Sequence, residues 1–170
     1  MAWGLAMTYT YYERLSGLDA TFLEVEDANC HMHIGGVAIF DAAPVTSASG
    51  SLDFDRIHTL MEAGMHRIPR YRQKLAWVPF GQGRPKWVDD PHLNLDDHVR
   101  HTSLPEPGSE HQLRTLAARF FSQQLDRSKP LWEMWLVEGL QGGRFAVIAK
   151  SHHCLVDGVS GVDITTVLFD

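Results

Sequence analysis

One short segment of the chain gathers the residue types that carry out acid–base chemistry. It reads Lys150-Ser151-His152-His153-Cys154-Leu155-Val156-Asp157-Gly158 and follows an apolar run that is typical of a buried strand. A loop at the end of a rigid strand is a common place for catalytic groups. An imidazole with an ordinary pKa of about 6.5 suits general-base catalysis at neutral pH. This segment therefore holds the best candidates for a catalytic site.

The two adjacent histidines are expected to lie in different surroundings. Neighbouring side chains on an extended chain point to opposite faces. We therefore expect one of His152 and His153 to face a cleft, and the other to be packed or hydrogen-bonded behind it. Asp157 can brace the loop by accepting a hydrogen bond or by pairing with an arginine, and Gly158 lets the backbone turn with positive φ. The pattern suits one positioned imidazole on a braced loop.

Other chemistries fit the segment less well. A zinc site needs three or four ligands around a tetrahedron, and contiguous residues such as His152, His153, Cys154 and Asp157 rarely satisfy one, so we expect no metal. A serine-hydrolase elbow needs G-x-S-x-G, and the stretch 158–162 lacks the last glycine. A lone cysteine is more often a small buried hydrophobe than a nucleophile. A histidine pair after a strand is itself more often structural than catalytic, and both interpretations stay open on the residues alone.

Helices are predicted by capping residues and by apolar side chains at helical spacing. In the first, Ser16 and Asp19 form a capping pattern, and Leu18, Phe22 and Val25 share the face that we expect to pack inward. The predicted helices cover four ranges: 16–25, 53–68, 109–125, and from about 158 to the end of the chain.

Strands are predicted between the helices, and Gln141–Arg144 is typical of a tight hairpin turn. The run Phe145–Ala149 is apolar throughout, as expected for a strand covered on both faces. Strands that alternate with helices predict an α/β fold, a two-layer sandwich built on a mixed sheet. The predicted strands cover six ranges: 36–40, 73–79, 86–88, 98–104, 131–137 and 145–149.

Length and composition place the chain among globular domains. It has 170 residues, of which 44% are hydrophobic and 21% charged, and a net charge of −6. That acidic balance argues against nucleic-acid binding. Two cysteines do not make a disulfide framework, so we expect reduced thiols and a cytoplasmic location. No apolar run is as long as a membrane span. Residues 1–14 are expected to form a poorly ordered extension.

Three motifs, in order, resemble one known family. The segment His152-His153-Cys154-Leu155-Val156-Asp157-Gly158 matches H-H-x-x-x-D-G, which marks the CoA-dependent acyltransferase superfamily. Leu15–Leu23 with His31–Gly36, and Pro130–Leu140 with its P-L-W and E-G-L, resemble the bacterial wax ester synthase/diacylglycerol acyltransferase family. The resemblance covers nearly the whole chain from Leu15. Gly17 departs from the family pattern, where proline is common.

The resemblance implies a chloramphenicol-acetyltransferase-like half and a fatty acyl transfer. Acyl-CoA would be the co-substrate, with no bound cofactor, and the acceptor would be the hydroxyl of diacylglycerol or of a long-chain alcohol. His153 would be the general base and His152 its support. Asp157 would fix the loop through an arginine that the sequence does not identify, and Gly158 would allow the turn.

The resemblance also sets expectations about partners. Family members comprise two similar halves, so residues 15–170 are expected to form the N-terminal acyltransferase domain, with the C-terminal half missing. A C-terminal half, or self-association through the exposed face, would complete the site, and contact with a membrane or lipid-droplet surface is a further expectation. The alternatives are an inactive truncated half, a lipid- or CoA-binding module, and another H-H-x-x-x-D-G enzyme of the condensation or polyketide-associated type.

Overall fold

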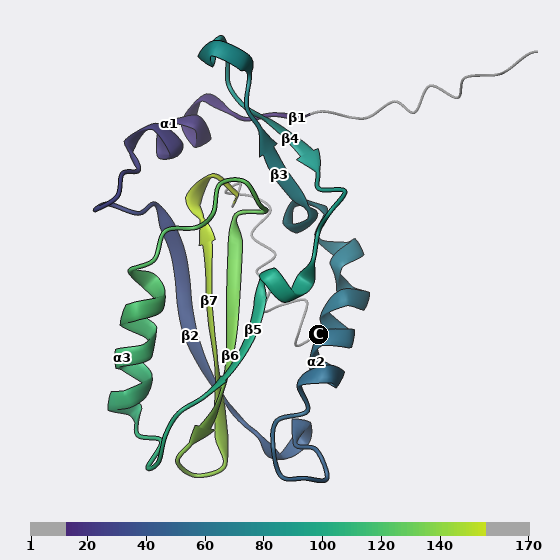
Figure 1. The fold of residues 1–170 in the computed structure, drawn as a ribbon, viewed down its shortest axis with the longest axis vertical. Coiled ribbons are helices and arrows are strands. Elements are labelled where there is room, and N and C mark those ends of the chain that lie inside the picture. Colours follow the sequence, from purple (N-terminus) through teal and green to yellow (C-terminus); the bar gives the residue numbers. More distant parts are fainter. Residues whose placement is uncertain (1–12, 156–170) are drawn as a thin grey trace, which may run out of the picture.

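The computed structural model describes residues 13–155 and is built around one four-stranded sheet (Figure 1). The strand order is β2-β7-β6-β5. The edge strand β5 runs parallel to β6, whereas β6, β7 and β2 are antiparallel neighbours, so the sheet is mixed. The bounds are β2 His33–Asp41, β5 Val99–Ser103, β6 Trp132–Leu140 and β7 Arg144–His152.

A smaller antiparallel sheet lies beyond one end of the large sheet (Figure 1). Its order is β1-β4-β3, with bounds β1 Glu13–Arg14, β3 Gln73–Ala76 and β4 Lys86–Asp89. Glu13 and Arg14 are the last two residues of the extension that was predicted to be poorly ordered, but they form a strand that pairs with β4. A two-residue strand carries too little pattern to be predicted from sequence.

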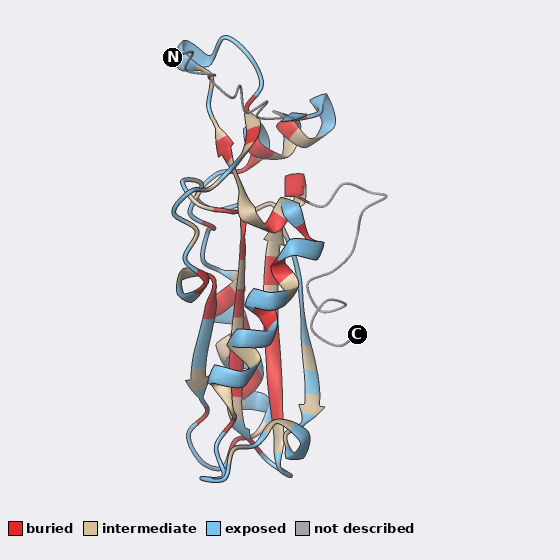
Figure 2. Ribbon diagram, turned by 90° about the vertical axis from the view of Figure 1, so that its right-hand side faces the viewer, coloured by how far each residue is buried: buried red, intermediate tan, exposed pale blue. Residues whose placement is uncertain are grey.

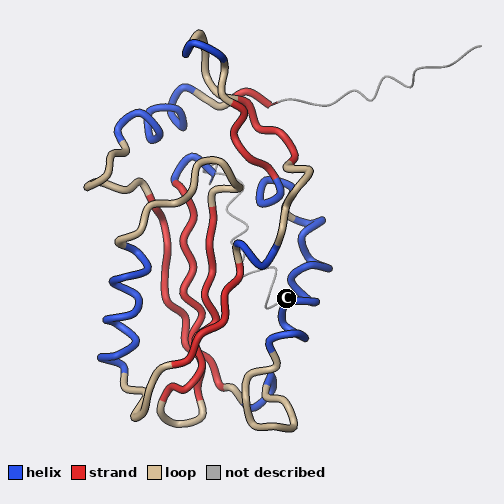
Figure 3. Tube along the Cα trace, in the orientation of Figure 1, coloured by secondary structure: helices blue, strands red, loops and turns tan. Residues whose placement is uncertain are grey.

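The helices lie around the large sheet (Figure 3). α3 (Glu110–Phe121) and α2 (Phe54–Gly64) run along opposite sides of it, and α1 (Gly17–Val25) crosses the end at which β7 finishes. Each helix begins at its predicted cap. The side chains of Ser16, Asp53 and Ser109 accept backbone N–H bonds three residues on, which satisfies donors that the first helical turn leaves free.

Strand β7 is the centre of the core, with both faces covered (Figure 2). Phe145 and Val147 pack into one hydrophobic cluster, with residues of α1, α2 and the small sheet. Ala146 and Ile148 pack into a second, which lies under α3. The predicted doubly covered strand is therefore confirmed, and so is the α/β class with its mixed sheet.

One predicted helix face was wrong. In α1 the buried residues are Ala20 and Leu23, whereas Leu18 is 71% exposed and Val25 51% exposed. The inward side of this short helix is set by its contact with residues 153–155, which spacing alone does not reveal.

Element boundaries moved by a few residues. α2 ends at Gly64 rather than 68, because the chain continues as two 3-10 turns, 65–67 and 69–72. Strand β7 extends beyond 149 to His152 because its pairing with β2 continues to His33. The hairpin turn after β6 is as predicted, with Gly142 and Gly143 at positive φ. The predicted fourth helix lies outside the described residues. Within residues 13–155, no helix is long and apolar enough to cross a bilayer.

Candidate active site

The histidine pair straddles the end of strand β7. His152 is its last residue and has no exposed surface, whereas His153 opens the 3-10 turn His153–Leu155 and is half-buried. The expected difference in surroundings is therefore confirmed, with His152 as the packed member. The ring of Phe22, from α1, stacks on the ring of His153. Asp157 and Gly158 lie outside the described residues.

The backbone around the pair is fixed by three hydrogen bonds. The His152 N–H donates to the carbonyl of Leu131 at 2.9 Å, and the His153 N–H donates to the carbonyl of Met32 at 2.8 Å. The Cys154 N–H donates to Nδ1 of His152 at 3.1 Å. The peptides on both sides of His153 are thus held by hydrogen bonds. Of the two histidine side chains, that of His153 is the one that is partly accessible to a substrate.

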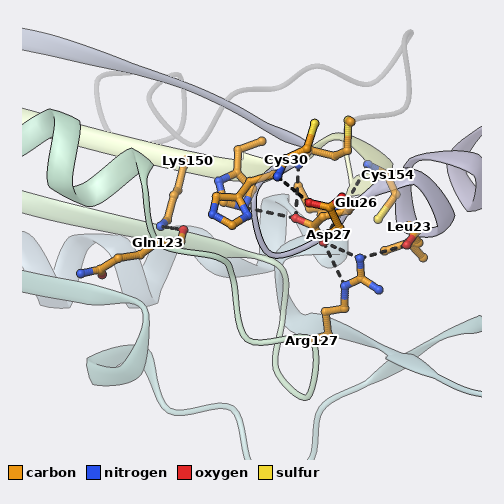
Figure 4. A network of polar contacts seen from close by, with 12 residues as sticks. Leu23, Glu26, Asp27, Cys30, Gln123, Arg127, Lys150 and Cys154 are labelled. Carbon is orange, nitrogen blue, oxygen red and sulfur yellow. Dashed lines mark hydrogen bonds and ion pairs between the residues drawn. The ribbon is translucent and has the colours of Figure 1, made fainter.

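A buried carboxylate contacts His152, and the network of polar contacts around this carboxylate is drawn in Figure 4. Glu26, whose side chain is 1% exposed, places Oε2 at 3.3 Å from Nε2 of His152 and Oε1 at 3.6 Å from Nε2 of His33. Arg127 donates from Nε to Oε2 at 3.0 Å. The backbone N–H of Met32 donates to Oε1 at 3.2 Å. One carboxylate therefore meets two imidazoles, a guanidinium and a peptide N–H.

The charges in this cluster are settled by burial and pairing. Burial alone would raise the pKa of Glu26, but hydrogen bonds from Arg127 and Met32 outweigh it and lower the pKa to about 2. Burial, with the charge of Lys150, lowers the pKa of His33 to about 4. Burial also lowers the pKa of His152. At neutral pH, a charged Glu26–Arg127 pair therefore lies among uncharged imidazoles.

These contacts select one tautomer of His152. Its Nδ1 accepts the Cys154 N–H, so in the neutral ring the proton resides on Nε2, the atom that faces Glu26. A carboxylate that holds the tautomer and orientation of a neighbouring imidazole is a recurring device of acid–base sites.

Lys150 forms a second buried polar contact two residues before the pair. Its Nζ donates to the carbonyls of Phe120 at 2.7 Å and Gln123 at 2.6 Å, and lies 3.6 Å from Oε2 of Glu133. Burial lowers its pKa. The ammonium satisfies carbonyls at the end of α3, where a positive charge is favoured. The end of α3 is thereby tied to β7.

The surroundings of Cys154 do not suit a thiol nucleophile. Burial raises the pKa of the Cys154 thiol to about 12, which disfavours the thiolate that a nucleophile requires. Cys30 and Cys154 are both free. Among residues 13–155, no group of three or more histidine, cysteine, aspartate or glutamate side chains has the arrangement of a metal site.

The segment Pro130–Leu140, which resembles the family and contains β6, contributes side chains to packing contacts. Trp132 donates from Nε1 to the carbonyl of Tyr71 at 2.8 Å and stacks on His98. Glu138 accepts the Leu52 N–H at 2.9 Å. These contacts fix β6 beside the elements that surround it.

Sequence reasoning missed Glu26 and Arg127. The structure pairs Arg127 with Glu26, 101 residues earlier along the chain. The arginine expected to pair with Asp157 stays a prediction, because Asp157 lies outside the described residues. Neither residue belongs to a motif with recognisable spacing. His33 lies in the quoted segment His31–Gly36 but was given no role.

Comparison with known proteins identifies the family. Residues 15–170 match the wax ester synthase/diacylglycerol acyltransferase catalytic domain. The chain belongs to this family. A probable diacylglycerol O-acyltransferase of Mycobacterium tuberculosis, tgs3, is 40% identical over 157 residues, covering 92% of this chain and 56% of the relative. A second from that organism, tgs1, is 38% identical over 159 residues, covering 92% of this chain and 33% of the relative. The chain thus spans between a third and somewhat more than half of these relatives.

Solved structures support the fold as well as the family. The wax ester synthase/diacylglycerol acyltransferase from Marinobacter aquaeolei VT8 superposes with a TM-score of 0.71 and 32% identity, covering 91% of this chain and 36% of that one. The starter condensation domain of rhizomide synthetase superposes with a TM-score of 0.69 at 11% identity, covering 94% and 38%. The wax ester synthase family and the condensation domains thus share the fold expected from the H-H-x-x-x-D-G resemblance.

Proposed function

We propose that this chain contributes the general-base half of an O-acyltransferase. The enzyme transfers a fatty acyl group from acyl-CoA to the hydroxyl of diacylglycerol or of a long-chain alcohol. The observation that carries the proposal is the half-buried His153, whose flanking peptides are held by hydrogen bonds to the Met32 carbonyl and to the His152 ring, in a chain of this family. A condensation domain of the same fold has been solved in complex with C8-CoA, which supports an acyl-CoA donor.

The reaction needs one proton acceptor and no covalent acyl-enzyme. His153 takes the proton of the acceptor hydroxyl as the oxygen attacks the thioester carbonyl. A tetrahedral intermediate forms, and its collapse breaks the carbon–sulfur bond. The leaving thiolate recovers the proton from the imidazolium, so ester and CoA–SH are the products. Asp157 and Gly158 are proposed to shape the loop after His153.

Release of CoA tests the proposal directly. The chain is incubated with palmitoyl-CoA and either diacylglycerol or hexadecanol, and free thiol is measured against His153→Ala. His111→Ala is the matched control, since His111 is an exposed histidine of α3. We expect turnover in the wild type and in the control, with self-association of the chain completing the site. We expect its loss in His153→Ala by a factor of about 100 or more, the size typical of a missing acid–base group.

Two results would contradict the proposal. Turnover retained by His153→Ala would remove that residue from the role of base. Palmitoyl-CoA binding without CoA release, with either acceptor, would favour the binding-module alternative for this chain. Assays with a carrier-protein thioester as donor would separate the condensation type.

We also propose that one end of the molecule contacts a lipid surface. Phe80 is 96% exposed, Trp77 is 52% exposed and Leu18 is 71% exposed. The turn between β3 and β4 that carries the first two lies at the same end as α1 (Figure 1). Exposed aromatic side chains are suited to the bilayer interface.

Vesicle sedimentation tests this contact. We expect Trp77→Ser/Phe80→Ser to bind phosphatidylcholine vesicles at least fivefold more weakly than the wild type. Leu60→Ser is the control, because Leu60 is similarly exposed but lies on α2. Equal binding by all three proteins would overturn the lipid contact and leave the acyl-transfer proposal intact.

A further inference from the structure

The carboxylate of Glu26 is connected to the backbone on both sides of His153. It touches neither the His153 side chain nor the exposed surface, and its own side chain is 1% exposed. A buried charge is costly unless it is paired and hydrogen-bonded, so a carboxylate at this position calls for an explanation. Its contacts supply one.

The first connection runs through Met32. The Met32 N–H donates to Oε1 of Glu26 at 3.2 Å, and the carbonyl of the same residue accepts the His153 N–H at 2.8 Å. Met32 stands immediately before β2, and these two bonds use both its N–H and its carbonyl. Fixing its N–H therefore fixes the acceptor that holds the His153 backbone.

The second connection runs through His152. Oε2 of Glu26 lies 3.3 Å from Nε2 of His152, and the other ring nitrogen, Nδ1, accepts the Cys154 N–H at 3.1 Å. A ring that rotated or changed tautomer would lose that bond. The carboxylate thus acts, through the ring, on the peptide that follows His153.

We propose that Glu26, paired with Arg127, is the positioning residue that holds His153 in place through Met32 on one side and His152 and Cys154 on the other. Arg127 supplies the opposite charge, with Nε at 3.0 Å from Oε2, and also donates to the carbonyl of Leu23 at 2.9 Å. The pair and its neighbours are shown in Figure 4. The catalytic part of this inference rests on the proposed function, because it assigns to His153 the role of base.

Hydrogen exchange tests the positioning without any assay of turnover. Glu26→Gln keeps the size of the side chain and removes its charge. We expect amide exchange at His153 and Cys154 to quicken at least tenfold, while amides in the middle of β6 change less than twofold. The control is Asp90→Asn, because Asp90 pairs with Lys74 at 2.9 Å and this pair is about as buried as the Glu26–Arg127 pair. The side chains of Asp90 and Lys74 are 7% and 30% exposed, and those of Glu26 and Arg127 are 1% and 29% exposed. Unchanged exchange at His153 and Cys154 would overturn the proposal.

Kinetics then test the consequence for the reaction. We expect Glu26→Gln to lower kcat by a factor of about 10 to 100, the range that a small misplacement of a catalytic group can cause. KM for acyl-CoA should stay within about threefold, because the Glu26 side chain is only 1% exposed and is not itself placed to meet the substrate. Asp90→Asn should leave both constants unchanged.

A double variant separates positioning from a purely structural role. Arg127→Gln alone leaves a buried carboxylate without its charge partner and is expected to lower the unfolding temperature. Glu26→Gln/Arg127→Gln removes both charges and should recover most of that loss while kcat stays low. Recovery of kcat together with stability would show that the pair is structural only. Should the wild type show no turnover, the proposed function fails, whereas the exchange result still decides the positioning.

Discussion

Gly35 lies opposite Lys150 in the pairing of β2 with β7, and the two strands approach so closely there that a side chain would not fit. A Cβ atom at position 35 would lie 2.4 Å from the carbonyl oxygen of Ala149 and 2.5 Å from a ring carbon of Phe121. Both distances are well inside van der Waals contact, and the oxygen belongs to the backbone. The glycine therefore sets the spacing between β2 and the strand that ends in the histidine pair.

Gly35→Ala is expected to destabilise the chain by about 2–3 kcal/mol, since relieving the contact requires the strands to separate. Gly36→Ala is the matched control, because the added Cβ would have no described atom within 4 Å. Urea denaturation of the two variants checks the difference. Equal unfolding free energies would show that the sheet spacing does not depend on Gly35.

Phe22 is expected to hold the His153 ring. The two ring centroids are 4.0 Å apart and the planes differ by 21°. Phe22→Leu keeps an apolar contact but removes the stacking, which is worth about 0.5–1.5 kcal/mol for aromatic pairs. We expect a loss of that size in unfolding free energy and a fall in CoA release of up to about tenfold, since 1.4 kcal/mol corresponds to a factor of ten.

The matching control for Phe22 is Val25→Ala on the same helix, because Val25 is 51% exposed. A Phe22→Leu variant with wild-type turnover and stability would mean that the stack does not hold the imidazole.

Stability is expected to fall as the pH drops below about 6.5. His33 has a pKa of about 4 in the folded chain against 6.5 ordinarily, so between these values the unfolded chain binds the proton and the folded chain does not. Glu26 has a pKa of about 2 against 4.5, so the same holds between 4.5 and 2. Each shift corresponds to about 3 kcal/mol. Both contributions are fully present above the ordinary pKa of the group and lost below its folded value.

Denaturation midpoints measured from pH 7.5 to 3 check this dependence. His33→Asn should flatten the part of the curve between about pH 6.5 and 4, while leaving the lower part. A curve of unchanged slope in that variant would assign the dependence to other groups.

Lys150 is expected to be a major contributor to stability. Lys150→Met leaves the carbonyls of Phe120 and Gln123 without their donor. Unpaired buried acceptors each cost about 1–3 kcal/mol, so a loss of about 3 kcal/mol is expected in chemical denaturation. Lys129→Met is the control, because Lys129 and its partner Asp97 are each 41% exposed and such pairs contribute about 0–1 kcal/mol. Similar losses in both variants would contradict the importance of the buried cap.

Local sequence patterns predicted most of the fold because helix capping and the burial of apolar runs depend on residues close together in the sequence. Ser16, Asp53 and Ser109 begin helices where their side chains can cap the first turn, and residues 145–148 are buried on both faces of the sheet. The inward face of α1 was not predictable in this way. Leu18 is as apolar as Leu23, and only the position of residues 153–155 decides which of them is covered.

The histidine pair was likewise found from its own spacing, but the groups behind it were not. Glu26, His33 and Arg127 come from the end of α1, the start of β2 and the loop before β6. Their meeting depends on how three distant segments close on one another, and no local period encodes that. An isolated glutamate that follows a helix end carries no signal that it will be buried.

The separation of Glu26 from its partners also bears on the order in which the chain acquires structure. Arg127 follows it by 101 residues, and the pairing of His33 with His152 joins the first strand of the large sheet to its last. Contacts so distant in sequence close only after most of the chain is available, and they slow folding. A nascent chain emerging from the ribosome can complete α1 early, but its Glu26 carboxylate has to remain hydrated until β7 has been synthesised. Of the strands within residues 13–155, β7 is synthesised last, and its synthesis closes the site.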